Sequence, residues 1–153
     1  MAVLVALAAS SVLTVASASA QVSWKLASAY PADNFHTQNL AAFANDVAQV
    51  TDGRLAIRIY PNASLLPASA IKSAMRIGQV QVGETLISLH HKEDPIFGID
   101  VVPFLATSYE EARKLWAASQ PTIARNFAAQ GLMVLFAGFK AIVPAADLKL
   151  AVV

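Results

Sequence analysis

Three histidines and ten carboxylates are the side chains of this chain whose types could support catalysis or ligand binding. His90 and His91 are adjacent, and Glu93 and Asp94 follow them closely. These four form the only sequence cluster of metal-ligating types. Adjacent histidines in a loop seldom point at the same ion, however, and the spacing matches no zinc signature. The segment 90–95 is therefore predicted to be a polar surface loop that holds no metal.

The sequence contains few residues or motifs that could support covalent catalysis. The chain contains no cysteine. It contains no G-x-S-x-G nucleophile elbow, no phosphate-binding P-loop and no G-x-G-x-x-G dinucleotide motif. Its histidines and carboxylates are not spaced as a nucleophile and its base. The sequence therefore predicts a binding protein that is not an enzyme and uses no cofactor.

Alternating strand-like and helix-like segments must position these side chains. Residues 54–60 show the period of two that is typical of a strand, with Leu55, Ile57 and Ile59 on one face. The uninterrupted apolar run 132–137 is typical of a strand that is covered on both faces. The predicted strands are residues 24–28, 54–60, 79–86 and 132–137. The segment 97–105 is judged too short and too proline-marked for a helix.

Helical periodicity and capping signals predict the intervening helices. Leu40, Phe43, Val47 and Val50 recur at helical spacing in residues 35–50, after a cap at Asp33 or Asn34. In the second helix, Ile71, Ala74, Met75 and Ile77 share a face until Gly78. The predicted helices are residues 35–50, a second that Pro67 opens, a third that the capping box Ser108 to Glu111 opens, and a fourth that Pro121 restarts. Arg125 on this last helix is expected to face solvent.

The order of elements predicts a layered α/β domain with a largely parallel sheet flanked by helices. Ligands in such sheets bind beyond the carboxyl ends of the strands. That edge would carry Ala29 and Tyr30, residues 62–64, and residues 84–88, which include Glu84 and Ser88.

Composition limits the class of protein further. The chain has 153 residues, of which 56% are hydrophobic and 14% charged, so it can build an apolar core without disulfides. Its net charge of +1 argues against a nucleic-acid-binding surface. Residues 1–20 are apolar and uncharged and end on Ala18-Ser19-Ala20, which predicts a cleaved signal peptide and a location outside the cytosol. No lysine or arginine follows Met1, so an uncleaved anchor and a misplaced start codon are the alternatives.

Five segments together resemble the solute receptors of tripartite ATP-independent periplasmic (TRAP) transporters, of the dicarboxylate-receptor type. They are Trp24-Lys25-Leu26-Ala27-Ser28, FHTQNLAAFANDV at 35–47, GRLAIRIYPNASL at 53–65, GQVQVGE at 78–84 and DVVPFLATSYEEARKLW at 100–116. The resemblance implies the first lobe of a periplasmic-binding-protein type II fold. It implies a periplasmic receptor that closes two lobes around a small organic acid, such as a C4-dicarboxylate, and presents it to the membrane subunits of the transporter.

The resemblance also implies that a second lobe is missing. The receptors of this family are about twice as long, and the arginine that pairs with the solute carboxylate comes from the part that this chain lacks. The expected organisation is a signal peptide at 1–20, the N-terminal lobe at 21–137 and a divergent tail at 138–153, as in a truncated or frame-shifted gene. A structural or interaction domain, or a non-functional fragment without a solute of its own, is the alternative.

Six residues are the candidates for the ligand cleft: Tyr30, Asn34, His36, Glu84, Ser88 and Phe104. Each has a competing structural explanation. Glu84 could contact a solute hydroxyl or ammonium or be a solvated carboxylate at a strand end. Asn34 is equally explained as a helix cap, and Phe104 as packing.

Overall fold

The computed structural model describes residues 21–137. The predicted signal peptide and the tail 138–153 lie outside the described residues. The described elements, in chain order, are β1 (Val22–Ala27), α1 (Phe35–Val50), β2 (Leu55–Tyr60), α2 (Ala68–Arg76), β3 (Val82–Gly83), the 3₁₀ helices η1 (Ile87–His90) and η2 (Pro95–Val101), and α3 (Tyr109–Ala128). No helix in this part of the chain combines the length and the apolar character needed to cross a bilayer.

The sheet is parallel, as the order of elements predicts, with the strand order β2-β1-β3. Trp24 pairs with Ile57 on one side of β1, and Leu26 pairs with Val82 on the other. The third strand is shorter than the predicted 79–86. The backbone N–H of Lys25 bonds to the Gln81 side chain, which replaces a ladder bond there, and the chain turns into η1 soon after Glu84 donates its N–H to the carbonyl of Ala27.

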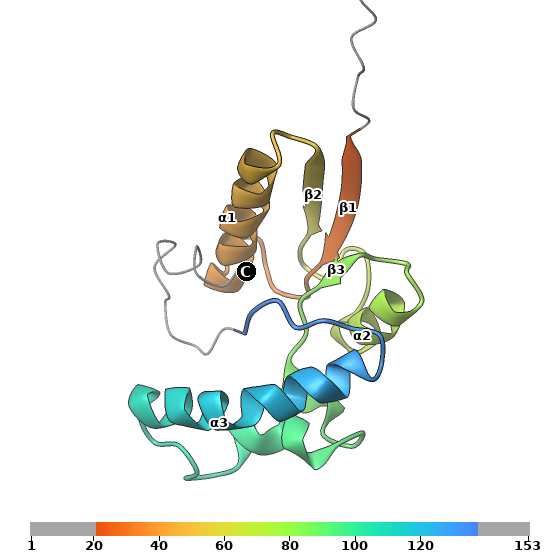
Figure 1. Ribbon diagram of the computed structural model, residues 1–153. Coiled ribbons are helices and arrows are strands. Elements are labelled where there is room, and N and C mark those ends of the chain that lie inside the picture. Colours follow the sequence, from red (N-terminus) through yellow and green to blue (C-terminus); the bar gives the residue numbers. More distant parts are fainter. Residues whose placement is uncertain (1–20, 138–153) are drawn as a thin grey trace, which may run out of the picture.

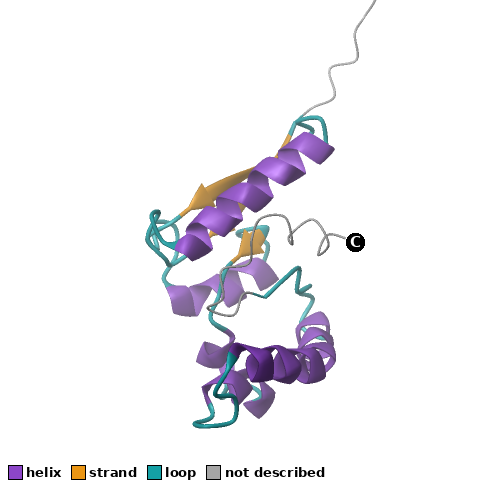
Figure 2. Ribbon diagram, turned by 90° about the vertical axis from the view of Figure 1, so that its left-hand side faces the viewer, coloured by secondary structure: helices purple, strands orange, loops and turns teal. Residues whose placement is uncertain are grey.

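Helices α1 and α2 pack against this sheet, α1 along β2 and α2 beside β3 (Figures 1 and 2). The bounds of α1 match the prediction, and the Asn34 side chain accepts the N–H of His36 at its start. In both helices, the last residue assigned to the predicted buried apolar face is in fact exposed. Val50 is 76% exposed as the last residue of α1, and Ile77 is 78% exposed at the C-cap of α2.

The second part of the fold lies beyond the carboxyl ends of the strands and contains η1, η2 and α3 (Figure 1). The prediction that 97–105 is not helical is wrong for its first part, because Asp94 accepts the N–H of Ile96 and Pro95 starts a 3₁₀ helix. The prediction that Pro121 separates two helices is also wrong. Helix α3 runs through Pro121, and Ile123 and Phe127 beyond it pack on Phe97, which holds the second half in place.

The apolar segment 132–137 is extended but joins no strand of the described sheet, which corrects the prediction of a covered strand. Leu132 and Val134 pack on the cluster of Phe97, Ile123 and Phe127, whereas Met133 is 80% exposed. An apolar run does not by itself provide the neighbouring strand that a covered strand needs. Figure 1 shows this segment returning from the end of α3 toward α1.

Candidate functional site

A cavity of about 430 Å³ lies between the sheet with α1 and the layer of η2 and α3. Every element of the described part of the chain except β2 contributes part of its wall. Its lining includes Leu26 of β1, Leu40 and Phe43 of α1, residues 84–87 after β3, Phe97 of η2, Trp116, Ile123 and Phe127 of α3, and residues 131–137. Most of these side chains are apolar. The cavity is therefore a mainly hydrophobic space at the sheet edge where a parallel α/β fold binds its ligands.

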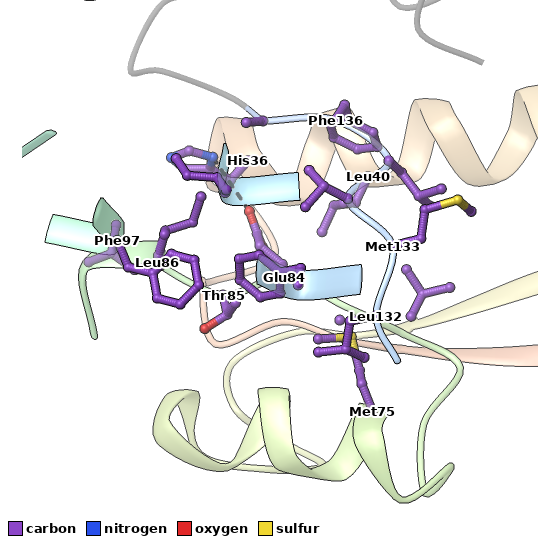
Figure 3. A pocket seen from close by; sticks show the side chains of 18 of the residues that line it. His36, Leu40, Met75, Glu84, Thr85, Leu86, Phe97, Leu132, Met133 and Phe136 are labelled. Atoms are coloured by element: carbon purple, nitrogen blue, oxygen red, sulfur yellow. Dashed lines mark ion pairs between the residues drawn. The ribbon is translucent and has the colours of Figure 1, made fainter. Parts of the chain in front are cut away.

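One wall of this cavity is polar and is built around Glu84 (Figure 3). The Ser28 hydroxyl donates to Oε2 of Glu84 at 2.5 Å, and the backbone N–H of Tyr30 donates to the same hydroxyl oxygen at 3.2 Å. The other carboxylate oxygen lies 3.4 Å from Nδ1 of His36. The side chains of His36 and Glu84 are 20% and 16% exposed. The ends of β1 and β3 and the start of α1 thus converge on one partly buried carboxylate.

Aromatic rings hold His36 in position. Its ring stacks on Tyr30 with centroids 4.6 Å apart and an interplanar angle of 19°. The centroid of the Phe35 ring lies 4.1 Å from that of His36, and the two rings are tilted by 30°. Since Asn34 fixes the first turn of α1 through the N–H of His36, both the backbone and the ring of His36 are constrained. The imidazole therefore presents a defined edge to Glu84.

The electrostatics of the cavity are dominated by the carboxylate. Burial raises the pKa of Glu84 above its ordinary value, and the Ser28 hydrogen bond and the nearby His36 oppose that rise. Within the described residues the lining contains no lysine and no arginine, and its second acid is Asp100. At Glu84 this wall can accept hydrogen bonds or positive charge, and among the described lining residues His36 is the one that carries positive charge when protonated.

Three of the six predicted site residues come together at the cavity: Tyr30, His36 and Glu84. The other three do not line it. Asn34 is the N-cap of α1, and the carbonyl of Ser88 accepts hydrogen bonds from the backbone and the ring of His91. Phe104 is 91% exposed and has a positive φ of 63°. The structure thus brings together Tyr30, His36 and Glu84 and leaves the cap of α1 and the two candidates after Glu84 outside the lining.

Sequence reasoning missed Ser28, which is 1% exposed and donates to the carboxylate. Thr85, whose hydroxyl lies 3.2 Å from Nε2 of His90 at the cavity wall, belongs to the predicted edge segment 84–88 but is not among the six candidates. The rule that places ligands at strand ends could have included Ser28 as well, since Ser28 directly follows β1. No local pattern reveals that Ser28 and Glu84, which are 56 positions apart, are partners.

Most of the segment 90–95 is exposed, as its composition predicts, but its first residue is buried. His90 is only 7% exposed and contacts Oε1 of Glu93 through Nδ1 at 3.1 Å. The other oxygen of Glu93 pairs with the buried ammonium of Lys72, which also lies 5.4 Å from the ring centroids of Phe97 and Phe127. A buried ammonium needs a partner, and the carboxylate of Glu93, whose side chain is 47% exposed, provides it. In residues 21–137, no three histidines or carboxylates are grouped to hold a metal.

Comparisons with known proteins agree on one family. The model of the family described as bacterial extracellular solute-binding protein, family 7 (DctP) matches residues 26–142. An uncharacterised protein of Haemophilus influenzae is 34% identical over 112 residues, which are 71% of this chain and 33% of that protein. A protein of Albidiferax ferrireducens described as a solute-binding protein is 32% identical over 79 residues, which are 52% of this chain and 23% of that protein.

Solved structures give the same result. DctP6 of Bordetella pertussis, an extracytoplasmic solute receptor that binds pyroglutamic acid, is 42% identical, with a TM-score of 0.74 over 75% of this chain and 38% of its own. A TRAP solute-binding protein from a marine metagenome, described as specific for pyroglutamate, is 39% identical, with a TM-score of 0.75 over 76% of this chain and 38% of its own. The matched part of this chain thus spans about a quarter to two fifths of the length of these relatives.

Proposed function

The chain belongs to family 7 of the bacterial extracellular solute-binding proteins, and we propose that it forms the first lobe of a receptor for a small organic acid that is taken up by a TRAP-type transporter. The observation that carries this proposal is the polar wall of the cavity. Ser28, His36 and Glu84 come from three separate elements and meet at the carboxyl edge of a parallel sheet. Ligand recognition explains why a carboxylate is held in a mainly apolar space at the cost of its hydration.

Pyroglutamate, the cyclic lactam of glutamate, is the solute we propose. The two solved structures described above are named for this ligand and share about two fifths of their residues with the matched part of this chain. A C4-dicarboxylate, which the resemblance of the sequence implies, would bring a second anion to a wall that carries Glu84 and, from residues 21–137, neither lysine nor arginine. We therefore favour the lactam acid over the dicarboxylate.

The proposed mechanism needs more than one lobe. In it, the cavity edge described here contacts one side of the solute, and the remainder of the receptor contacts the carboxylate. Closure of the two lobes is then stabilised by ligand contacts that exist only in the closed form. The chain alone is expected to bind weakly, because it makes only part of these contacts.

A titration followed by ¹⁵N-resolved nuclear magnetic resonance tests the proposal, because this method detects millimolar binding. Pyroglutamate is expected to cause saturable shifts of the backbone signals of Ser28, His36 and Glu84. Succinate and malate serve as the dicarboxylate comparison. If neither the lactam acid nor the dicarboxylates produce saturable shifts, this chain is an exported domain without a solute and the proposal is wrong.

We also propose that the protein acts in the periplasm after loss of residues 1–20. The support is the Ala18-Ser19-Ala20 cleavage pattern together with the extracytoplasmic character of the family. Intact-mass measurement of the exported protein is expected to give a chain that begins at Gln21. A species that retains Met1 would contradict the cleavage.

A further inference from the structure

We propose that Glu84 selects the solute by accepting a hydrogen bond from an uncharged donor on it, a lactam or amide N–H, and that this makes the lobe specific for lactam acids over dicarboxylates. The inference rests on the receptor function proposed above and assigns one contact within it. It is carried by the spare acceptor capacity of Glu84, by the charge of the cavity wall and by the aromatic surface beside the carboxylate.

Glu84 has acceptor positions that its protein partners do not fill. A carboxylate has about four lone-pair positions. In the described part of the chain, Ser28 donates to one oxygen and His36 lies beside the other. The remaining capacity belongs to a side chain that lines the cavity and is 16% exposed. Because this capacity is largely removed from bulk water, a donor from the solute would satisfy it with a charge-assisted hydrogen bond.

The charge of the wall determines which solutes fit. Glu84 and Asp100 are the acids among the described lining residues, and no lysine or arginine accompanies them. A second carboxylate on the solute would face Glu84 at close range, and like charges in a partly desolvated site repel more strongly than they do in water. A neutral N–H of the solute at the same place would instead donate a hydrogen bond to Glu84. The wall therefore discriminates by charge as well as by hydrogen bonding.

The shape of the wall favours a small ring. Tyr30 and His36 are stacked at an angle of only 19°, and both line the cavity next to Glu84. A nearly planar five-membered lactam can lie with its carbon face against such an aromatic surface while its edge reaches the carboxylate. A saturated open-chain dicarboxylate such as succinate has no flat carbon face to place there and loses more rotational freedom on binding. The aromatic pair and Glu84 thus recognise two features of the same solute.

The experiment changes the solute one atom at a time and uses the full chain. Pyroglutamate is compared by ¹⁵N-resolved titration with the γ-lactone acid of the same shape, in which a ring oxygen replaces the N–H. The lactone is expected to bind at least roughly tenfold more weakly, because the buried acceptor of Glu84 then stays unpaired. Since this comparison uses the unmutated protein, it does not depend on whether a variant folds.

A variant pair then assigns the effect to Glu84. Glu84→Gln is expected to weaken pyroglutamate binding by roughly tenfold. A hydrogen bond to a charged acceptor is stronger than one to a neutral acceptor by about 1.4 kcal/mol, which corresponds to this factor in affinity. It is also expected to narrow the gap between pyroglutamate and succinate. Glu110→Gln is the matched control, because it removes the same charge from a side chain on α3 that is 78% exposed and paired with Lys114.

Each result has a distinct meaning. Equal binding of the lactam and the lactone by the unmutated chain would overturn the role of Glu84 and leave the receptor function intact. Glu84→Gln binding pyroglutamate as tightly as the Glu110→Gln control would do the same. Failure of every acid to bind would instead contradict the receptor function, and the selectivity with it.

Discussion

Replacement of Gly83 by alanine is expected to destabilise the protein through a local steric clash. A Cβ atom at this position would overlap Cγ2 of Ile71 and would lie 2.9 Å from Sδ of Met75. The thioether of Met75 is flexible and can move. Ile71 cannot move as easily, because it is 0% exposed and its Cγ2 branches next to the backbone. β3 or α2 must therefore shift.

The magnitude follows from two opposing effects. Overpacking of a core position costs about 1–3 kcal/mol. Loss of glycine flexibility in the unfolded chain returns about 0.4–1 kcal/mol. The net destabilisation of Gly83→Ala is thus expected to be about 1–2 kcal/mol, which lowers the melting temperature by roughly 4 °C per kcal/mol in a domain of this size. The Glu84 carboxylate follows directly on β3, so solute binding should weaken as well.

Urea denaturation of a double-mutant cycle with Ile71→Ala provides the test. Ile71→Ala alone is expected to cost about 2–5 kcal/mol, because it leaves a cavity in the core. In the double variant the new methyl group of residue 83 partly fills that cavity. The loss of unfolding free energy in the double variant should therefore be about 1–2 kcal/mol smaller than the sum of the losses in the two single variants. Additive costs, or a Gly83→Ala variant as stable as the parent, would refute the clash between β3 and α2.

Three further predictions concern charged and capping groups. Lys72→Met is expected to change the free energy of unfolding by less than about 1 kcal/mol. Glu93→Gln removes the counter-charge of a buried ammonium and should cost about 1–3 kcal/mol in urea denaturation, less than for a fully buried pair because the Glu93 side chain is 47% exposed. The Lys72 hydrogen bond lowers the pKa of Glu93, so this stability is present above pH 4.5 and is lost as the pH falls through the lowered pKa. Burial raises the pKa of Glu84, so the protonated carboxyl contributes its full stability below pH 4.5, and this stability is lost as the pH rises through the raised pKa. Melting curves recorded from pH 4.5 upward through the raised pKa should therefore show Glu84→Gln becoming more stable relative to the parent. Ser108→Ala removes the N-cap of α3 and should cost about 1 kcal/mol by thermal or urea unfolding.

The elements best predicted from the sequence are those whose signals are local. Helix α1 begins after the Asn34 cap and ends at Val50, as its periodicity indicates. The Ser108 cap marks the start of α3. In the predicted capping box, Ser108 accepts the N–H of Glu111, and the Glu111 carboxylate reaches back to the backbone and hydroxyl of Thr107. These interactions span only a few residues, so the sequence contains all of their parts.

Predictions failed where distant contacts decide the structure. Pro121 removes one N–H from α3, but the packing of Ile123 and Phe127 on Phe97 keeps the helix continuous. The buried His90 contacts one oxygen of Glu93, and the other oxygen pairs with Lys72, which is 21 positions from Glu93. The site behaves in the same way: the strand-end rule finds Glu84, but the partnership with Ser28 exists only after the sheet has formed.

The strand order β2-β1-β3 also has a consequence for how the fold is acquired. The central strand is the first one in the chain, and its two neighbours come later. Pairing of Leu26 with Val82 must wait until the intervening residues, which include α1, β2 and α2, are available. Closing so long a loop is slow compared with forming a helix. A chain that is still emerging from a ribosome or a membrane channel therefore keeps Leu26 and Ala27 incompletely covered, and the site at their carboxyl end assembles only in the last steps of folding.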